Sequence, residues 1–194
     1  MKWRKYKILF AFMIPALLLA SALFAQPGED EELSPKDRFF FGGNFSLMFG
    51  YITNVEVSPL VGYYIAPRLA AGAGVRFEFY KDKGYYYPYQ TTIYGGNIFT
   101  RYLLIKNLGE GMIIGLNTGI FAQVEYELLS LEKEYFEPPY TEDGRFLDHA
   151  VLVGGGITQP VGRRSAFLIT VLYNLNEGIR SPYSNPIIRV GFVF

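Results

Sequence analysis

A chain of 194 residues without cysteine has no disulfide framework and no thiolate metal site, and its single histidine excludes a metal site built from several histidines of one chain. Eighteen basic and eighteen acidic residues give no net positive charge, which argues against a nucleic-acid partner. Aromatic residues make up 18% of the chain, glycine is frequent, and long helical patterns are missing after the first segment, so the composition favours β-structure. We expect no cofactor and no bound metal.

Residues 1–25 are predicted to be a cleaved secretory signal peptide. Four basic residues within the first seven precede the apolar run 8–20, which is the order found in such signals. Cleavage can follow Ala22 or Ala25, and we prefer Ala25 because the polar chain begins there. A retained membrane anchor is the alternative, but the apolar run is short for a spanning helix, which needs about 20 residues. Removal of the four basic residues leaves fourteen Lys and Arg against eighteen Asp and Glu.

The remaining chain divides into a polar arm and a region of short apolar runs. Residues 26–38 contain proline and charges and almost no apolar side chains, so they are predicted to form a flexible periplasmic arm. Residues 39–194 alternate between apolar and polar side chains in runs separated by turn signals, as in a transmembrane β-barrel. The eight predicted strands are 39–51, 54–65, 69–80, 91–105, 112–126, 149–159, 166–175 and 187–194. The fold class is therefore all-β, an eight-stranded antiparallel up-and-down transmembrane β-barrel.

The alternation also predicts which face of each strand meets lipid. In the last run Ile188, Val190, Phe192 and Phe194 point one way, whereas Arg189 and its glycine neighbour point the other. Across the runs the polar set is mostly Gly, Ser, Asn and Thr, which is a poor aqueous exterior but suits the interior of a narrow barrel. We therefore assign the apolar set to the outside and expect the last run to pair with the first and the seventh.

Aromatic residues and loop lengths predict the orientation. With both termini in the periplasm, outward aromatic residues gather at two heights, as in the girdles of membrane proteins. The lower group comprises Phe39, Phe41, Tyr63, Tyr102, Phe192 and Phe194. The upper group comprises Phe49, Tyr51, Phe79, Tyr94, Tyr126 and Tyr173. Turns at 66–68, 106–111 and 160–164 make the lower connections short, whereas 81–90 and 127–148 make two upper loops the longest. A further short turn is expected around Ile52 and Thr53, and Pro59 should cause a bulge or a missing ladder bond in its strand.

Three stretches support a family resemblance: VGYYIAPRLAAG at 61–72, Arg101-Tyr102, and LYNLN at 172–176. With the eight runs, they make the chain resemble the small outer-membrane barrels of Gram-negative bacteria, OmpA/OmpX-like in the broad sense and of the Bacteroidota type. The resemblance implies an outer-membrane location, contact with outer-membrane lipid and lipopolysaccharide, and recognition by the barrel-assembly machinery. It implies that Phe192 and Phe194 are the assembly signal, although the glycine usual in that signal lies further upstream than Gly191.

Six charged residues have the parity of the barrel interior. They are Glu56, Arg76, Glu78, Arg101, Glu125 and Arg189. Unpaired charges in a space of low dielectric constant are costly, so these residues should form a polar network of internal ion pairs. We expect the network to fill the barrel. The alternative is a polar conduit, which would make the protein a narrow, porin-like channel for small solutes.

Two predicted upper loops carry candidate binding residues. The tyrosines Tyr85, Tyr86, Tyr87 and Tyr89 around Pro88 either stack on sugar rings or a partner surface, or belong to the upper girdle, which we prefer. The acidic loop contains Glu127, Glu132, Glu134, Glu137, Glu142, Asp143 and Asp148. It lacks the alternating acidic residues and central glycine of a calcium loop, so we expect a solvated or lipopolysaccharide-bridging loop. An extracellular ligand or protein could bind through these loops.

A catalytic role has little support in the sequence. His149 beside Asp148 is the only histidine that could act as a general base, and Ser130 and Ser165 lie in no recognisable nucleophile motif. The sequence therefore predicts a non-enzymatic outer-membrane barrel with a structural or surface-interaction role. A narrow channel is the second hypothesis, and a lipid-active enzyme is the third.

Overall fold

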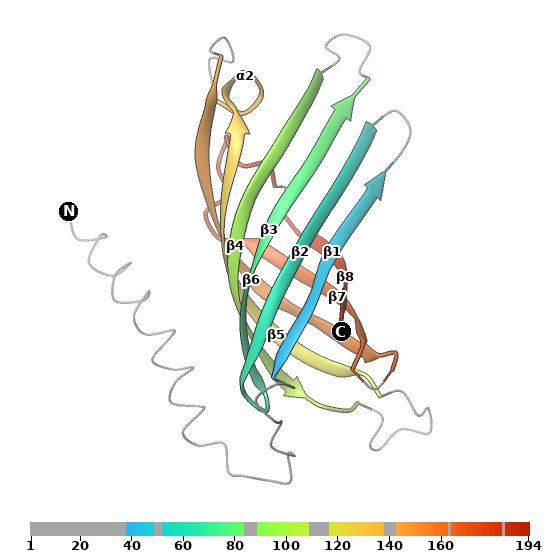
Figure 1. The fold of residues 1–194 in the computed structure, drawn as a ribbon. Coiled ribbons are helices and arrows are strands. Elements are labelled where there is room, and N and C mark those ends of the chain that lie inside the picture. The colour runs from blue at the N-terminus through green and yellow to red at the C-terminus, as the bar shows by residue number, and fades with distance from the viewer. Residues whose placement is uncertain are drawn as a thin grey trace, which may run out of the picture. The chain divides into compact units, whose positions relative to one another are not determined.

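Eight antiparallel strands close into a barrel in the computed structural model (Figure 1). The structure describes residues 38–48, 52–83, 89–108, 117–137, 143–162, 164–183 and 185–194. The chain divides into two units, Met1–Glu32 and Leu33–Phe194, and all described residues belong to the second. The predicted signal peptide, and the predicted arm up to residue 37, lie outside the described residues. In the described part of the chain, no helix has the length and apolarity needed to span a membrane.

Each strand pairs with the next along the chain, and β8 returns to β1. The strands are β1 (Phe39–Met48), β2 (Ile52–Ala66), β3 (Leu69–Asp82), β4 (Tyr89–Ile105), β5 (Gly119–Glu132), β6 (Arg145–Pro160), β7 (Ala166–Asn174) and β8 (Ile187–Val193). A single helical turn, α2 (Lys133–Phe136), follows β5. We call the end of the barrel where β1 begins the lower end and the opposite end the upper end. The prediction of an eight-stranded antiparallel up-and-down barrel is confirmed.

Several predicted boundaries are wrong. Ile52 and Thr53 belong to β2 instead of a turn. β5 runs to Glu132 and β6 begins at Arg145, so much of the predicted loop 127–148 is strand. The first part of the predicted fifth strand, 112–116, lies outside the described residues, and β5 begins only at Gly119. In the described residues, 117 and 118 precede β5 and are not part of a strand.

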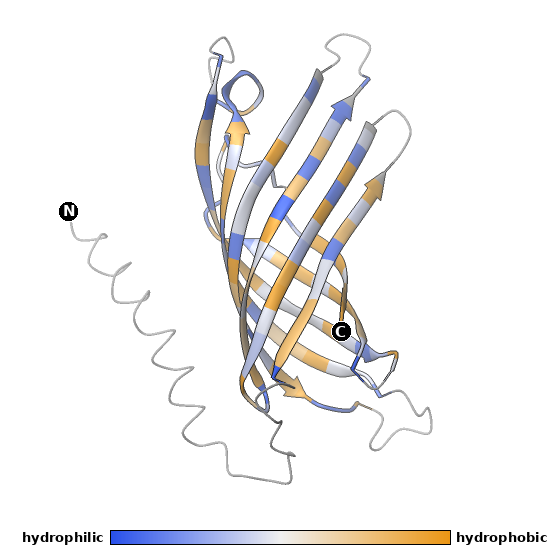
Figure 2. Cartoon of the chain, viewed as in Figure 1, coloured by the Kyte–Doolittle hydropathy of each residue, from blue (hydrophilic) through white to orange (hydrophobic). Residues whose placement is uncertain are grey.

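The exposures follow the predicted assignment of faces. Large apolar side chains are exposed on the outer wall, for example Phe77 at 60% and Ile188 at 66%, whereas Arg76 and Arg189 beside them are buried. Figure 2 shows the resulting alternation of apolar and polar residues along the strands. Two members of the predicted upper girdle, Phe49 and Tyr51, lie outside the described residues.

Pro59 interrupts the pairing of β2 and β3 without a bulge. The pairs pass from Val57↔Phe77 to Leu60↔Gly74 in the same register, so two positions of β2 lack a ladder partner in β3. Of the two predicted outcomes at Pro59, a bulge or a missing ladder bond, the structure therefore has the missing bond, because proline has no N–H to donate. The register of β2 shifts instead between Tyr64 and Ala66, next to the turn into β3.

The closure between β1 and β8 is short. Pairing covers only Gly42–Phe45 with Val190–Val193, and two backbone hydrogen bonds of 2.9 and 2.8 Å join Phe41 to Phe194. β8 also pairs with β7, so the prediction of both neighbours of the last strand is confirmed. Figure 1 shows β1 to β4 rising well above the upper ends of β7 and β8.

Candidate functional site

The interior of the barrel is occupied by side chains at three levels. At the lower level Phe40, Ala70 and Phe99 form a buried apolar cluster, against which Tyr64 packs. Arg101 pairs with Ala70 and lies beside this cluster, with its guanidinium carbon 5.4 Å from the centre of the Phe99 ring.

Arg101 is held by an aromatic ring and an amide. Its guanidinium carbon is 4.6 Å from the centre of the Phe121 ring, and its Nε donates to Oε1 of Gln123 at 3.0 Å. The aromatic contacts stabilise a cation that has little access to water. Arg101 is therefore held in the lower half of the lumen by aromatic and amide contacts, and its described contacts include no direct ion pair.

The middle level is centred on Arg76. Glu56 and Glu78 are directly paired across β2 and β3, so their carboxylates face each other inside the barrel. Arg76 separates them, with its Nη2 atom 2.6 Å from Glu78 and 3.3 Å from Glu56. Its Nη1 atom is 3.6 Å from Glu127 on β5. Two like charges thus share one guanidinium, which offsets their repulsion.

Arg189 of β8 extends the cluster across the barrel. Its Nη1 atom is 2.7 Å from Glu125, and its Nη2 atom is 3.4 Å from Glu127. Glu125 also accepts hydrogen bonds from Asn97 at 2.6 Å and from Gln123 at 2.9 Å. Glu127 therefore bridges the two arginines, and the network connects strands on opposite sides of the lumen.

Tyr183 reaches this cluster from the connection between β7 and β8. Its hydroxyl accepts hydrogen bonds from Arg76 at 2.5 Å and from Arg189 at 3.3 Å, and it donates to Glu127. Burial raises the pKa of the Tyr183 phenol, so the hydroxyl keeps its proton at physiological pH. The tyrosine therefore attaches the connection to the charged centre.

The upper level is apolar and is covered by the upper connections. Its buried members are Ile93, Leu129, Leu131, Ala150, Leu152, Leu172 and Tyr183. Phe136 of α2 and Phe146 of β6 pack on this cluster from above. Arg180 is 2.8 Å from Glu137 and lies over the Phe146 ring at 5.6 Å, so it joins the two longest upper connections.

All six predicted lumen residues point into the barrel, but the structure groups them unevenly. Glu56, Arg76, Glu78, Glu125 and Arg189 belong to the ion-pair cluster, whereas Arg101 lies below it. Sequence reasoning missed Glu127, Tyr183, Asn97 and Gln123 as members. The continuing alternation of Gln123, Glu125 and Glu127 along β5 was the available signal for Glu127. Tyr183 lies in a segment without periodicity, so no pattern marked it.

The predicted loop residues do not form one binding group. Glu127 is in the lumen, Glu132 is 2.8 Å from Arg145, and Glu137 is paired with Arg180. Glu142 and the tyrosines at 85–87 lie outside the described residues. Over the ranges that the structure describes, no group of three or more His, Asp or Glu side chains is placed to hold a metal ion.

The candidate catalytic residues are also separated. His149 and Asp148 are adjacent in β6, so their side chains leave opposite faces of the strand, and His149 is exposed on the outer wall. Ser130 accepts a hydrogen bond from Nε of Arg145 at 2.9 Å. Ser165 lies in the lower turn between β6 and β7, at the other end of the barrel from His149. The described residues thus contain no assembled nucleophile and base from this set.

Comparison with protein-family models and with curated proteins found no match for the chain. Among solved structures, the crystal structure of the N-terminal β-barrel domain of Pseudomonas aeruginosa OprF is similar. It is 8% identical in sequence, the TM-score is 0.42, and the alignment covers 80% of this chain and 94% of that domain.

Proposed function

We propose that this protein is an integral β-barrel of the outer membrane of a Gram-negative bacterium, with a structural or surface-interaction role and a lumen filled by side chains. The observation that carries the proposal is the distribution of polarity: the outer wall is apolar and the interior contains ion pairs. A water-soluble barrel has the opposite arrangement, with a polar exterior around an apolar interior. A bilayer is the environment that suits such an exterior.

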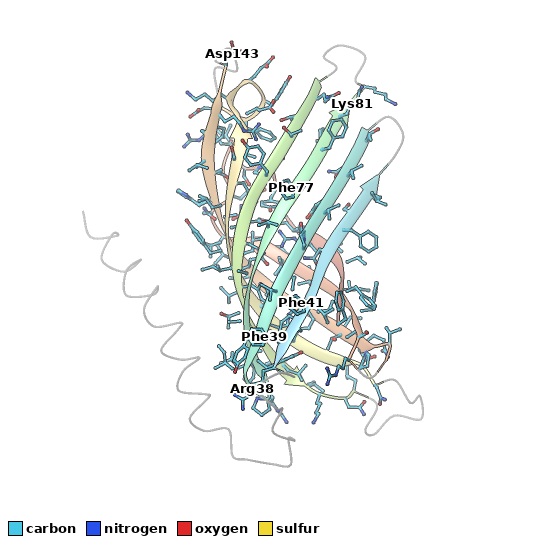
Figure 3. All side chains as sticks on the ribbon, in the orientation of Figure 1. Arg38, Phe39, Phe41, Phe77, Lys81 and Asp143 are labelled. Carbon is cyan, nitrogen blue, oxygen red and sulfur yellow. The ribbon has the colours of Figure 1, made fainter. Side chains whose placement is uncertain are left out.

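The height of the apolar wall supports the same proposal. Exposed apolar residues extend from Tyr94 to Leu104 on β4 and from Leu147 to Ile157 on β6. Ten residues of strand, rising about 3.3 Å each and tilted by about 40°, cover about 25 Å, the height of the apolar band of outer-membrane barrels. Figure 3 shows that Phe39, Phe41 and Phe77 lie on the wall, whereas Lys81 and Asp143 lie near the upper end.

The proposed orientation has both termini in the periplasm. The first and last strands start and finish at the lower end, where backbone bonds join Phe41 to Phe194. The arm at 26–38 would then be periplasmic, and the connections 133–144 and 175–186 would face the outside of the cell. In this proposal outer-membrane lipid and lipopolysaccharide surround the wall. The barrel-assembly machinery reads Phe192 and Phe194.

The upper part of β6 supports a surface-interaction role. Residues 145–151 pair with β5, whereas pairing with β7 begins only at Leu152. The edge of β6 that faces β7 is partly covered here by Asn176. Its side chain accepts a hydrogen bond from the Val151 N–H at 2.8 Å and donates one to the His149 carbonyl. Together with the upper connections, this edge is where an extracellular ligand or protein would bind by adding to the sheet.

Cell fractionation and gel mobility test the membrane proposal. The protein should be recovered in the outer-membrane fraction and should migrate differently on gels before and after boiling, because folded barrels resist detergent. Recovery in a soluble fraction would refute the proposal.

Planar-bilayer recordings test the filled lumen. The purified protein should give no conductance steps, since buried side chains occupy all three levels of the interior. Steady ion conductance would favour the narrow-channel alternative. We further propose that the protein is not an enzyme, and unchanged lipid profiles on substitution of His149 by alanine would support this.

A further inference from the structure

A hollow of about 530 Å³ lies on the outer wall across β4, β5 and β6. Strand pairing explains its shape, because Gly96 is flanked by Leu128 in one row and Tyr94 by Ser130 in the next. The two small residues, Gly96 and Ser130, leave space between larger neighbours. The main walls are Tyr94, Ile98, Tyr126, Leu128 and Leu147.

Barrel packing does not require the glycine at the base of the hollow. A Cβ atom added to Gly96 would have one neighbour, the Gly74 carbonyl oxygen at 3.4 Å, which is an ordinary contact. A Cβ atom on the adjacent Gly95 would come within 2.1 Å of the Leu128 carbonyl oxygen. Gly95 is thus needed for the interior, whereas Gly96 keeps an outward space open.

A fixed cation marks the upper end of the hollow. The Arg145 guanidinium carbon lies 4.4 Å from the centre of the Tyr94 ring, which is one of the walls. Arg145 donates to the Ser130 hydroxyl at 2.9 Å and to the Thr92 and Ser130 carbonyl oxygens at 2.7 and 2.6 Å. It also forms an ion pair with Glu132 at 2.8 Å, and its side chain keeps 25% of its surface exposed. Outward arginines in membrane barrels are tolerated near the interface, where they reach lipid head groups.

His149 adds a second polar group to the same wall. It lies on β6, is exposed, and pairs directly with Leu128 across the sheet. Arg145, Leu147 and His149 therefore present two basic side chains on either side of an apolar one. Polar residues that face hydrocarbon are costly unless they have a partner.

We infer that this hollow binds one phosphorylated, acylated glycolipid of the outer leaflet. One acyl chain lies against Gly96 between the aromatic and aliphatic walls, and a phosphate lies against Arg145. The inference rests on the proposed function, because that orientation places the hollow in the leaflet where such lipids are found. Such a lipid would differ from the lipids that surround the rest of the wall, because it occupies one defined position and its phosphate needs the positive charge of Arg145.

Native mass spectrometry of the purified full-length protein with lipid A tests the inference. The native sequence should retain one lipid A molecule after the detergent is removed. Gly96→Leu should fill the hollow, and Arg145→Gln should remove the charge-assisted bond. Arg145→Gln should lower the retained fraction about tenfold, the loss expected for one such bond, and Gly96→Leu should lower it by excluding the acyl chain. Arg145→Lys should retain part of the binding.

The controls separate this inference from the proposed function. Val171→Leu changes an exposed apolar residue of β7 that does not line the hollow and should leave retention unchanged. Phosphatidylglycerol, which has a single phosphate and two chains, should be retained less well than lipid A. Equal retention of lipid A by the native protein, Gly96→Leu and Arg145→Gln, each with normal heat-modifiable mobility, would refute the inference. Absence of the native protein from the membrane fraction would refute the proposed function instead.

Discussion

Tyr183, in the connection between β7 and β8, donates a hydrogen bond to Glu127 of β5 in the middle of the barrel. The same hydroxyl accepts from Arg76 and Arg189, so one loop residue contacts three charged side chains from three strands. The upper connection between β7 and β8 is thereby joined to the lumen network. The filled state of the barrel depends on this connection as well as on the strands.

Replacement of Tyr183 by phenylalanine should show how much this attachment stabilises the fold. The change removes one of the hydrogen-bond donors to the buried Glu127 carboxylate, which keeps its contacts with Arg76 and Arg189, so the free energy of unfolding should fall by about 1–3 kcal/mol near neutral pH. Because the folded state raises the pKa of Tyr183, its contribution is complete below the ordinary tyrosine pKa of about 10 and is lost as pH rises above it. Urea unfolding in lipid vesicles at pH 8 and pH 11 measures the difference between the two proteins. Tyr173→Phe, at an exposed position, should show no such pH-dependent difference.

Replacement of Arg76 by glutamine should be more damaging. Glu56 and Glu78 would then face each other without their shared cation, and breaking a buried ion pair costs about 3–5 kcal/mol. Unfolding in urea should show the loss, and changing Glu78 to leucine and Arg76 to methionine together should recover part of it. Arg180→Gln removes an exposed pair and should cost less than about 1 kcal/mol. Equal effects of the two arginine substitutions would contradict the buried network.

The close packing of β6 and β7 at Gly154 leads to a third prediction. An alanine at position 154 would place its Cβ atom 2.0 Å from the Val171 carbonyl oxygen, so the two strands would have to separate. We expect Gly154→Ala to reduce the yield of heat-modifiable barrel strongly, at a cost of about 1–3 kcal/mol or more. Gly162→Ala has no neighbouring atom within 4 Å and should fold normally. Normal folding of both variants would show that the strands can move apart without cost.

Changes to the last residue, Phe194, can separate assembly in cells from the stability of the folded barrel. Phe194→Ala keeps the backbone bonds to Phe41, so refolding of the purified protein should be nearly unchanged. If Phe194 is read by the assembly machinery, the same variant should reach the outer membrane in lower amounts. Deletion of Phe194 removes the backbone bonds as well and should impair both processes. Equal amounts of Phe194→Ala and native barrel in the membrane would contradict the assembly signal.

The sequence predicted the number of strands and their faces because the exposed wall is apolar and the interior is polar, so the side chains alternate along most strands. The prediction of the end of the fifth strand was wrong, because Leu129 and Leu131 of β5 point into the barrel and belong to the upper apolar cluster. With apolar residues on both faces, the alternation ends at Tyr126, and the acidic residues that follow resemble a loop. The same error removed Glu127 from the predicted network.

The parts of the site that depend on tertiary packing could not be predicted. Tyr183 enters the lumen because Arg76, Arg189 and Glu127 offer it three partners, and these partners come from three different strands. Arg101 was expected among the ion pairs but is held by Phe121 and Gln123. Parity places a side chain inside or outside the wall, but it does not give the height at which that side chain finds its partner.

The short closure between β1 and β8 determines where the barrel is weakest. Only four residue pairs and the bonds between Phe41 and Phe194 join two strands that are separated by almost the whole length of the barrel sequence. Closing such a long loop costs chain entropy, and few contacts offset that cost. Heat or lateral tension should therefore separate β1 from β8 first, while the seven longer pairings between consecutive strands remain intact. The opened barrel would be a curved sheet whose two free edges are already in the right order to close again.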